Sequence, residues 1–392
     1  MKKLLSLLLG AILLTSLVAC GGGEASSSES TTIIQPASSS TPEPEPLRQA
    51  YLTGLEQTAD YPTGQRICAV MVSNIADSRP TSGLSQAKIV YEIKVEGGIT
   101  RFMAVFEDYE TMPRVGPVRS ARDQFLQMLI PSLGLYVHDG PNQNQPTNWM
   151  LRDYDYDDYD LQPDYEGGLT WRDSARRSAG FKTEYTEYTD GEHIAAAIER
   201  KEKDASRTYN SPIFDFVSYE EPARELADGT AAEVGIIHSN SYRTVFDFNA
   251  TSGRYDMSMF NSSSRVRAVE KAVDENNGEQ LAFDNVLVLF APMTLYSNSP
   301  LVKVDYGNMG IGYYFNGGRY ETIRWSKGGP DAPLRLWVND TTETSLKVNP
   351  GTSYIAVVDD TELEAFYNNM VAGTSAENAG QGEVSSGAEE VD

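Results

Sequence analysis

The chain contains very little cysteine, and this scarcity limits how its fold is stabilised. Of its 392 residues only Cys20 and Cys68 are cysteines. Two cysteines allow at most one disulfide, and neither a CxxC pair nor a zinc-ligand spacing occurs. A disulfide framework and a structural zinc site are therefore not expected. We expect the folded part of the chain to depend on its hydrophobic core.

Basic residues are also scarce relative to acidic ones. The sequence has 32 lysines and arginines against 56 aspartates and glutamates, which gives a net charge of −24. Nucleic acid is not an expected partner, because phosphate backbones are bound by basic surfaces. Several enzyme motifs are absent as well, including the P-loop, the dinucleotide-binding fingerprint, HExxH and the Gly-x-Ser-x-Gly elbow. No cofactor is predicted.

Long apolar runs are missing except at the start of the chain. Lys2 and Lys3 precede the apolar residues 4–17, a layout typical of a secretory signal and too short for a spanning helix. Ala19 and Cys20 then complete a sequence similar to the lipobox of bacterial lipoproteins. We expect residues 1–19 to be a signal peptide and Cys20 to carry lipid such as palmitate, which would anchor the protein to the outer face of the cytoplasmic membrane. An ordinary cleavage site that happens to contain cysteine is the alternative.

Composition divides the rest of the chain into four parts. Residues 20–50 are rich in Gly, Ser, Pro and Glu, which predicts a disordered tether. Residues 51–205 alternate strand-like runs with helix signals, which predicts an α/β layer domain. Residues 206–370 hold mainly strand-like runs, with an Asn-Gly hairpin signal at 316–317, and predict a mostly β domain. Residues 371–392 are expected to be a disordered tail. The predicted fold class is α+β or α/β.

Several strings in both domains resemble a known family. They are Glu-Gly-Gly-Ile-Thr-Arg at 96–101, Gly-Pro-Val-Arg-Ser-Ala-Arg at 116–122, and two runs at 312–327 and 346–355. They are similar to the YerB-like bacterial lipoprotein family, a two-domain group of unknown function. The resemblance implies an envelope lipoprotein but no reaction. One element departs from the family pattern, because no Pro-His-Asn string follows the arginine-rich stretch at 172–177.

The main candidate site is a group of arginines in the first domain. Pro117 is predicted to begin a helix that continues to Leu129, so that Arg119 and Arg122 share a face near its N-terminus. Arginine binds carboxylates and phosphates with two parallel hydrogen bonds, which predicts an anion-binding cleft. Structural ion pairs with Glu92, Glu96 and Asp123 are the alternative. The predicted ligand-binding residues are Asn74, Arg79, Arg101, Arg119, Ser120 and Arg122.

Three further residues are weak candidates for catalysis. Glu92 and Glu96 form a potential carboxylate pair of the kind that glycosidases use. His138 ends a predicted strand, where α/β folds often place a general base. A hairpin turn with flanking charges is the other interpretation of the glutamates. A hydrogen-bonded structural role is the other interpretation of the histidine.

An acidic stretch in the first domain partly matches a calcium-binding loop. Asp153, Asp155, Asp157 and Asp164 match positions one, three, five and twelve of a calcium loop. Asp158, however, stands where such a loop needs glycine. No metal is therefore predicted, and a solvated acidic loop is the preferred interpretation.

These observations favour a binding protein over an enzyme. The leading hypothesis is a lipid-anchored extracytoplasmic protein that uses its arginine cleft to bind a cell-wall polymer or an envelope protein. A cell-envelope hydrolase that uses Glu92 or Glu96 with His138 is one alternative. A scaffold that activates a cell-wall synthesis enzyme is another.

Overall fold

The computed structural model describes residues 48–140, 146–164, 167–261, 268–339 and 344–372. The predicted signal peptide, Cys20 and nearly all of the predicted tether lie outside this part of the chain. The predicted tail lies outside it from residue 373 onward. Among the described residues, no helix is long and apolar enough to cross a membrane.

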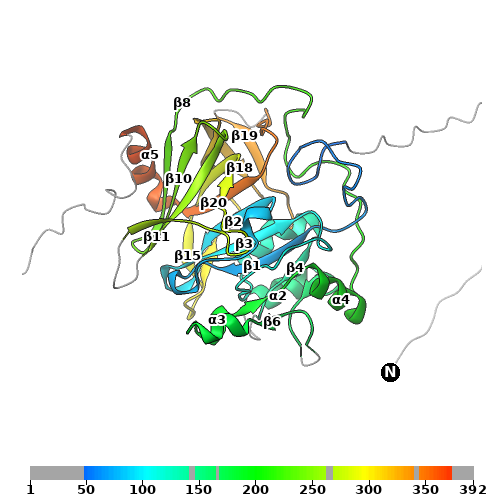
Figure 1. The fold of residues 1–392 in the computed structure, drawn as a ribbon. Coiled ribbons are helices and arrows are strands. Elements are labelled where there is room, and N and C mark those ends of the chain that lie inside the picture. Colours follow the sequence, from blue (N-terminus) through cyan, green and yellow to red (C-terminus); the bar gives the residue numbers. More distant parts are fainter. Residues whose placement is uncertain (1–47, 141–145, 165–166, 262–267, 340–343, 373–392) are drawn as a thin grey trace, which may run out of the picture. The chain divides into compact units, whose positions relative to one another are not determined.

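One eleven-stranded sheet passes through the described part of the chain (Figure 1). In spatial order its strands are β19 (Arg335–Val338), β18 (Arg319–Ser326), β17 (Gly310–Asn316), β14 (Asn285–Ala291), β20 (Ser353–Asp359), β2 (Ile89–Lys94), β3 (Thr100–Phe106), β1 (Cys68–Ser73), β4 (Leu135–Val137) and β5 (Asp160–Leu161), with β8 (Gly229–Thr230) paired to β18. Strands β2 and β20 are parallel neighbours, from Ile89 opposite Ser353 to Ile93 opposite Val357. This pairing joins the sheet strands of the first half of the chain to those of the second.

The second half of the chain is mostly β. A further sheet has the order β12 (Ala268–Lys271), β11 (Arg254–Asn261), β10 (Tyr242–Asn249) and β9 (Glu233–Ser239), with β13 (Ala282–Phe283) paired to β11. The predicted Asn-Gly hairpin is confirmed, because it connects the antiparallel strands β17 and β18. Two small ribbons complete the strands: β15 (Met293–Leu295) with β16 (Val302–Val304), and β6 (Trp171–Arg172) with β7 (Glu187–Tyr188).

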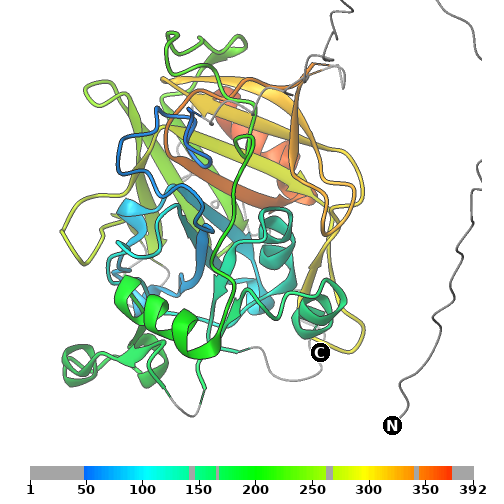
Figure 2. The ribbon, with the colours of Figure 1, turned by 90° about the vertical axis from the view of Figure 1, so that its right-hand side faces the viewer.

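Most of the helical segments lie in the first half of the chain. The α-helices are α1 (Asp123–Leu129), α2 (Pro146–Asp153), α3 (Ser174–Ser178), α4 (Gly191–Lys201) and α5 (Leu363–Ala372). Short 3-10 turns are η1 (Ala76–Ser78), η2 (Leu84–Gln86), η3 (Glu96–Gly98), η4 (Ile130–Ser132), η5 (Thr183–Tyr185) and η6 (Asp360–Glu362). In Figure 2 the green helices α3 and α4 lie at the end of the molecule away from the orange strands β18 and β19. The predicted fold class is confirmed, since an α/β first region precedes a mostly β second region.

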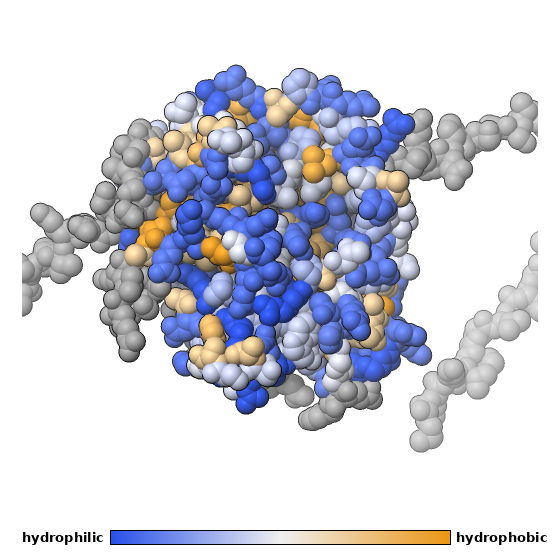
Figure 3. Space-filling model, viewed as in Figure 1, coloured by the Kyte–Doolittle hydropathy of each residue, from blue (hydrophilic) through white to orange (hydrophobic). Residues whose placement is uncertain are grey.

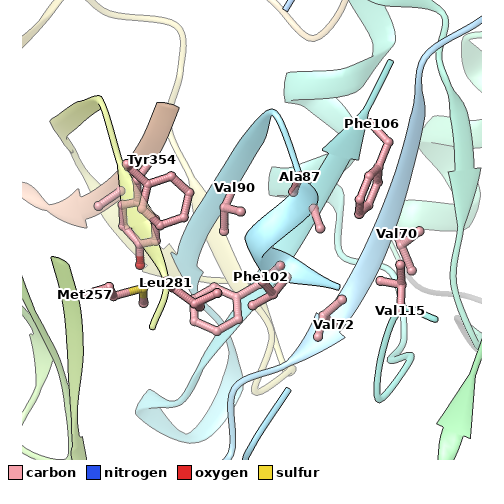
Figure 4. Close-up of a cluster of buried hydrophobic side chains, with 14 of the residues drawn as sticks. Val70, Val72, Ala87, Val90, Phe102, Phe106, Val115, Met257, Leu281 and Tyr354 are labelled. Carbon is pink, nitrogen blue, oxygen red and sulfur yellow. The ribbon is translucent and has the colours of Figure 1, made fainter. Parts of the chain in front are cut away.

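Side chains alternate along the central strands and so supply two separate cores. Val90 of β2 and Phe102 of β3 face the second sheet, where they join Met257, Leu281 and the ring of Tyr354 (Figure 4). Residues between them, such as Tyr91 and Met103, face the opposite side and pack with α1 and α2. Because both faces are covered, the central strands are buried along most of their length and are mainly apolar.

The predicted helix at 117–129 is wrong in its first half. Residues 115–121 are not helical: Val115, Gly116 and Val118 form isolated β-bridges, and α1 begins only at Asp123. The backbone N–H of Val118 donates to the Glu187 carbonyl (2.7 Å), and that of Arg119 donates to the Met71 carbonyl (2.9 Å). The segment therefore takes its hydrogen bonds from β1 and β7 instead of forming a helical turn.

Candidate functional site

Most of the candidate residues gather at one edge of the large sheet. Strands β1, β4 and β5 are parallel, and β3 is antiparallel to both β1 and β2, so β1, β2, β4 and β5 end at the same edge. Asn74, Glu96 and His138 follow three of these ends, and Arg101 lies near the start of β3. Ligands of open α/β sheets commonly bind outside this carboxyl edge.

Arg101, Arg119, Arg122 and Glu96 form the arginine cluster at this edge. Arg122 Nε donates to Glu96 Oε2 (2.9 Å), and Arg122 Nη2 donates to Glu96 Oε1. Arg101 Nη2 donates to the same Oε1 (3.1 Å), while its Nη1 donates to the Ser120 carbonyl. The side chains of Arg101 and Arg122 are 5% and 8% exposed, so both guanidinium groups are largely buried.

The cluster holds more positive than negative charge. Burial lowers the pKa of Arg101 to about 9, and the neighbouring charges of Arg122 and Arg119 add to this effect while Glu96 opposes it. Burial acts against ionisation of Glu96, but the hydrogen bond from Arg122 and the charges of both buried arginines lower its pKa to about 2. The Glu96 carboxylate thus pairs with two guanidinium groups, and Arg119 adds a third positive charge nearby.

Arg119 is the accessible arginine of the cluster. Its Nη1 donates to the Glu184 carbonyl (3.3 Å), and its guanidinium carbon lies 5.9 Å from the centre of the Tyr185 ring. It forms no ion pair with a carboxylate of the described residues. Arg101 and Arg122 have the structural ion pairs that were the alternative interpretation, whereas Arg119 and the half-buried Ser120 remain available at the surface.

Asn74 and Arg79 do not join the arginine cluster, contrary to the predicted grouping. Arg79 Nη2 donates to the side-chain and backbone oxygens of Asn74 (both 3.1 Å), and its Nη1 donates to the Phe260 carbonyl (3.0 Å). Asn74 in turn donates to Glu92 Oε1 (2.9 Å). Both residues lie on the face of the sheet that packs against β9–β12, because their partner Glu92 points there.

Glu92 is the centre of a buried polar network. Its Oε1 accepts hydrogen bonds from Asn74 and from Thr100 (2.7 Å), and its Oε2 accepts from Thr244 (2.8 Å) and from the Tyr354 hydroxyl. His238 Nε2 lies 3.2 Å from the same Oε2. The Glu92 side chain is fully buried. Burial opposes its ionisation, but the His238 charge and these hydrogen bonds lower its pKa to about 2.

The two glutamates of the proposed catalytic pair lie on opposite faces of the sheet. Glu92 is two residues after Val90 in β2, so both side chains lie on the face that packs against the second sheet. Its partners there come from β9 and β10. Glu96 instead binds Arg101, which is two residues before Met103 in β3 and therefore lies on the other face of the sheet with it. The described geometry therefore does not bring the two carboxylates to one substrate.

His138 has a partner other than these glutamates. Its Nε2 lies 2.6 Å from Asp160 Oδ1, and its ring centre lies 4.8 Å from that of Tyr136. The His138 side chain is fully buried, and its Nδ1 has no hydrogen-bond partner among the described residues. This arrangement corresponds to the structural interpretation of the histidine.

The acidic loop does not converge on a metal position. Asp164 Oδ2 is 2.7 Å from Lys201 Nζ and 3.1 Å from Arg200 Nη1, so lysine and arginine neutralise it. Asp153 pairs with its neighbour Arg152. Within the described ranges, no group of three or more His, Cys, Asp or Glu residues is placed to hold a metal ion.

The structure also contains a cavity that sequence reasoning missed. The tyrosine cavity, of 360 Å³, is lined by residues that include Tyr51, Tyr61, Tyr209 and Glu107. These residues come from separate segments of the chain and match no local motif. The only sequence signal is the large number of tyrosines, 22 in the whole chain.

Known proteins are similar to this chain over most of its length. Two family models match, "Protein of unknown function (DUF3048) N-terminal domain" over residues 52–205 and the corresponding C-terminal domain over residues 233–355. The Bacillus subtilis (strain 168) protein named "Putative lipoprotein YerB" is 29% identical over 315 residues, which cover 76% of this chain and 88% of that protein. The crystal structure of the YerB protein from Bacillus subtilis superposes with a TM-score of 0.65 at 25% identity, covering 80% of this chain and 97% of that one. The resemblance predicted from the sequence is confirmed.

Proposed function

The chain belongs to the DUF3048 family of proteins of unknown function, and from this premise we propose that it is a lipid-anchored envelope protein that binds an anionic ligand at its arginine cluster. In this proposal Cys20 carries the lipid, and the folded part faces outward from the cytoplasmic membrane. The name of the Bacillus subtilis relative, a lipoprotein, supports the anchor. The ligand is an acidic group of a cell-wall polymer or of an envelope protein.

The observation that carries the proposal is the imbalance of charge in the arginine cluster. Arg101 and Arg122 pair with the single carboxylate of Glu96, and Arg119 is close enough for its charge to act on Arg101, within a chain whose net charge is −24. The two buried arginines raise the local positive potential, and the accessible Arg119 supplies hydrogen-bond donors toward a carboxylate or phosphate. The site lies at the carboxyl edge of the sheet, where such folds bind ligands.

The two alternative functions receive less support from the geometry. A hydrolase would need Glu92 or Glu96 beside His138, and each of the three has a separate set of partners. A scaffold would present a large apolar surface. Figure 3 shows a mostly hydrophilic face with small, separate hydrophobic areas. The large hydrophobic side chains that are exposed belong to different segments: Leu55, Trp149, Leu295, Met309 and Tyr367.

Crosslinking in intact cells tests the proposal. A photoreactive residue at position 120 in the full lipidated chain is expected to capture the acidic partner, and Arg119→Ala is expected to abolish this capture. Arg152→Ala is the matched control, because Arg152 is a well-exposed arginine (72%) that lies outside the cluster. Capture that is equal in the Arg119→Ala and unsubstituted chains would refute the arginine cluster as the binding site.

A further inference from the structure

The tyrosine cavity lies at the opposite edge of the sheet from the arginine cluster. Arg101 is near the beginning of β3, and Glu107 comes directly after its end at Phe106. At about 3.3 Å per residue, six residues of strand separate the two positions by about 20 Å. The cavity is therefore separate from the site proposed above, and its volume of 360 Å³ falls in the range of small-molecule sites.

Three tyrosine rings are held rigidly around this cavity. The rings of Tyr51 and Tyr209 are stacked, with centres 3.8 Å apart and planes inclined by 19°. The Tyr51 hydroxyl is 2.7 Å from Ser132 Oγ, and the Tyr209 hydroxyl donates to the Ser132 carbonyl (3.2 Å). The Tyr61 hydroxyl donates to Glu107 Oε1 (3.3 Å). Tyr51 and Tyr209 cover one face of each other, and the Arg207 guanidinium carbon lies 5.4 Å from the centre of the Tyr209 ring, so the ring of Tyr61 is the main aromatic surface left for a ligand.

Glu107 supplies a buried negative group with spare hydrogen-bonding capacity. The residue is only 8% exposed. Its Oε1 accepts from the Leu52 backbone N–H (2.6 Å) and from Tyr61, while its Oε2 accepts no hydrogen bond from the described residues. Burial raises the pKa of Glu107, although the Leu52 hydrogen bond and the charge of Lys88 act in the other direction. Lys88 lines a neighbouring cavity that Tyr61 and Glu107 also line, but it does not come within ion-pair distance of Glu107 in the described structure.

An enclosed carboxylate without a paired cation is unfavourable, and a cationic ligand would remove that penalty. Aromatic rings attract ammonium groups through their negative faces, and tyrosine cages are a common means of binding them. We propose that the tyrosine cavity binds a primary ammonium group on a short aliphatic stem, with Glu107 as its counter-ion and the Tyr61 ring beside the cation. An anionic ligand is disfavoured by Glu107 and by the net charge of the chain.

Calorimetric titration of the full Cys20→Ser chain with two matched probes tests this proposal. n-Pentylamine and 1-pentanol have the same stem, but only the amine is charged at pH 7. We expect the amine to bind at least tenfold more tightly than the alcohol, because charge-assisted hydrogen bonding and cation–π attraction act only on the amine. Equal affinities, or no detectable binding of the amine, would overturn the proposal.

Substitutions at two positions, Glu107 and Tyr61, locate the binding and remain informative if one of the variants unfolds. Glu107→Gln keeps an acceptor for Leu52 and is expected to weaken amine binding at least tenfold. Glu56→Gln is the control, because it removes the same charge from an exposed neighbouring position that does not line the cavity. Tyr61→Phe, which keeps the ring, is expected to retain binding, and Tyr61→Leu is expected to lose it. Unchanged affinity in Glu107→Gln or in Tyr61→Leu would contradict the assignment.

Discussion

The network around Glu92 should dominate the stability of the contact between the two sheets. Glu92→Gln replaces one carboxylate oxygen by an amide NH₂, which cannot accept the hydrogen bonds that oxygen now receives. On the Oε2 side these come from Thr244 of β10 and Tyr354 of β20. Removing one partner from a buried charged network lowers the free energy of unfolding by about 3–5 kcal/mol.

The same carboxylate makes stability depend on pH in a direction that the structure fixes. The pKa of Glu92 falls from 4.5 to about 2 in the folded protein, because the His238 charge and the hydrogen bonds outweigh burial. At about 1.4 kcal/mol per pKa unit, the ionised group contributes about 3 kcal/mol. Since the folded pKa is the lower one, this contribution is complete above pH 4.5 and is lost as the pH falls toward 2.

Denaturant titrations followed by tryptophan fluorescence at pH 7 and pH 2.5 measure both effects. The difference in unfolding free energy between the unsubstituted chain and Glu92→Gln should be about 3–5 kcal/mol at pH 7. This difference in unfolding free energy between the two chains should be smaller by about 2 kcal/mol at pH 2.5 than at pH 7. Glu220→Gln, at an exposed position, is the control and should change little at either pH. A difference that does not vary with pH would refute the reasoning, because the ionised form of Glu92 would then contribute nothing.

Further predictions concern other buried groups. Burial raises the pKa of the fully enclosed Cys68 thiol. In a Cys20→Ser chain, a thiol reagent should therefore react with Cys68 slowly in the native state and quickly in denaturant. Rapid labelling of the native protein would contradict the described burial. Asp274 accepts hydrogen bonds from the Gly83 N–H (3.0 Å) and from both the N–H and hydroxyl of Ser85, so Asp274→Ala should lower the unfolding free energy by about 2–3 kcal/mol. A chemical denaturation midpoint equal to that of the unsubstituted chain would exclude this role.

The fold class was predictable because it depends on local patterns. Apolar runs of strand length identified β1, β2 and β3, and the Asn-Gly pair identified the turn between β17 and β18. The non-helical conformation of residues 115–121 was not predictable, since the hydrogen-bond partners of this segment lie in β1 and near residue 187. A proline followed by helix-forming residues looks the same in sequence whether or not such distant partners exist.

The candidate site was predictable only in part, for the same reason. The arginine-containing string at 116–122 predicted Arg119 and Arg122 as site residues, and in the structure Arg101 lies beside them. The division of the glutamates between two faces depends on where η3 turns and on which sheet covers β2. The partners of Glu92 come from β9, β10 and β20, far along the chain, and no spacing within residues 51–205 indicates them.

The parallel pairing of β2 with β20 has a consequence for how the chain acquires its structure. Residues 89–93 of β2 can form this pairing only after β20, at residues 353–359, has been synthesised and has reached them. Pairing over so long a separation closes slowly compared with the local hairpin of β2 and β3. A fragment that ends at residue 205 would leave β2 as an uncovered edge that is apolar apart from Glu92 and the terminal Lys94, which is a template for association with other chains. Expression of the first half alone should therefore give oligomers or aggregates, and a separately supplied second half should suppress them.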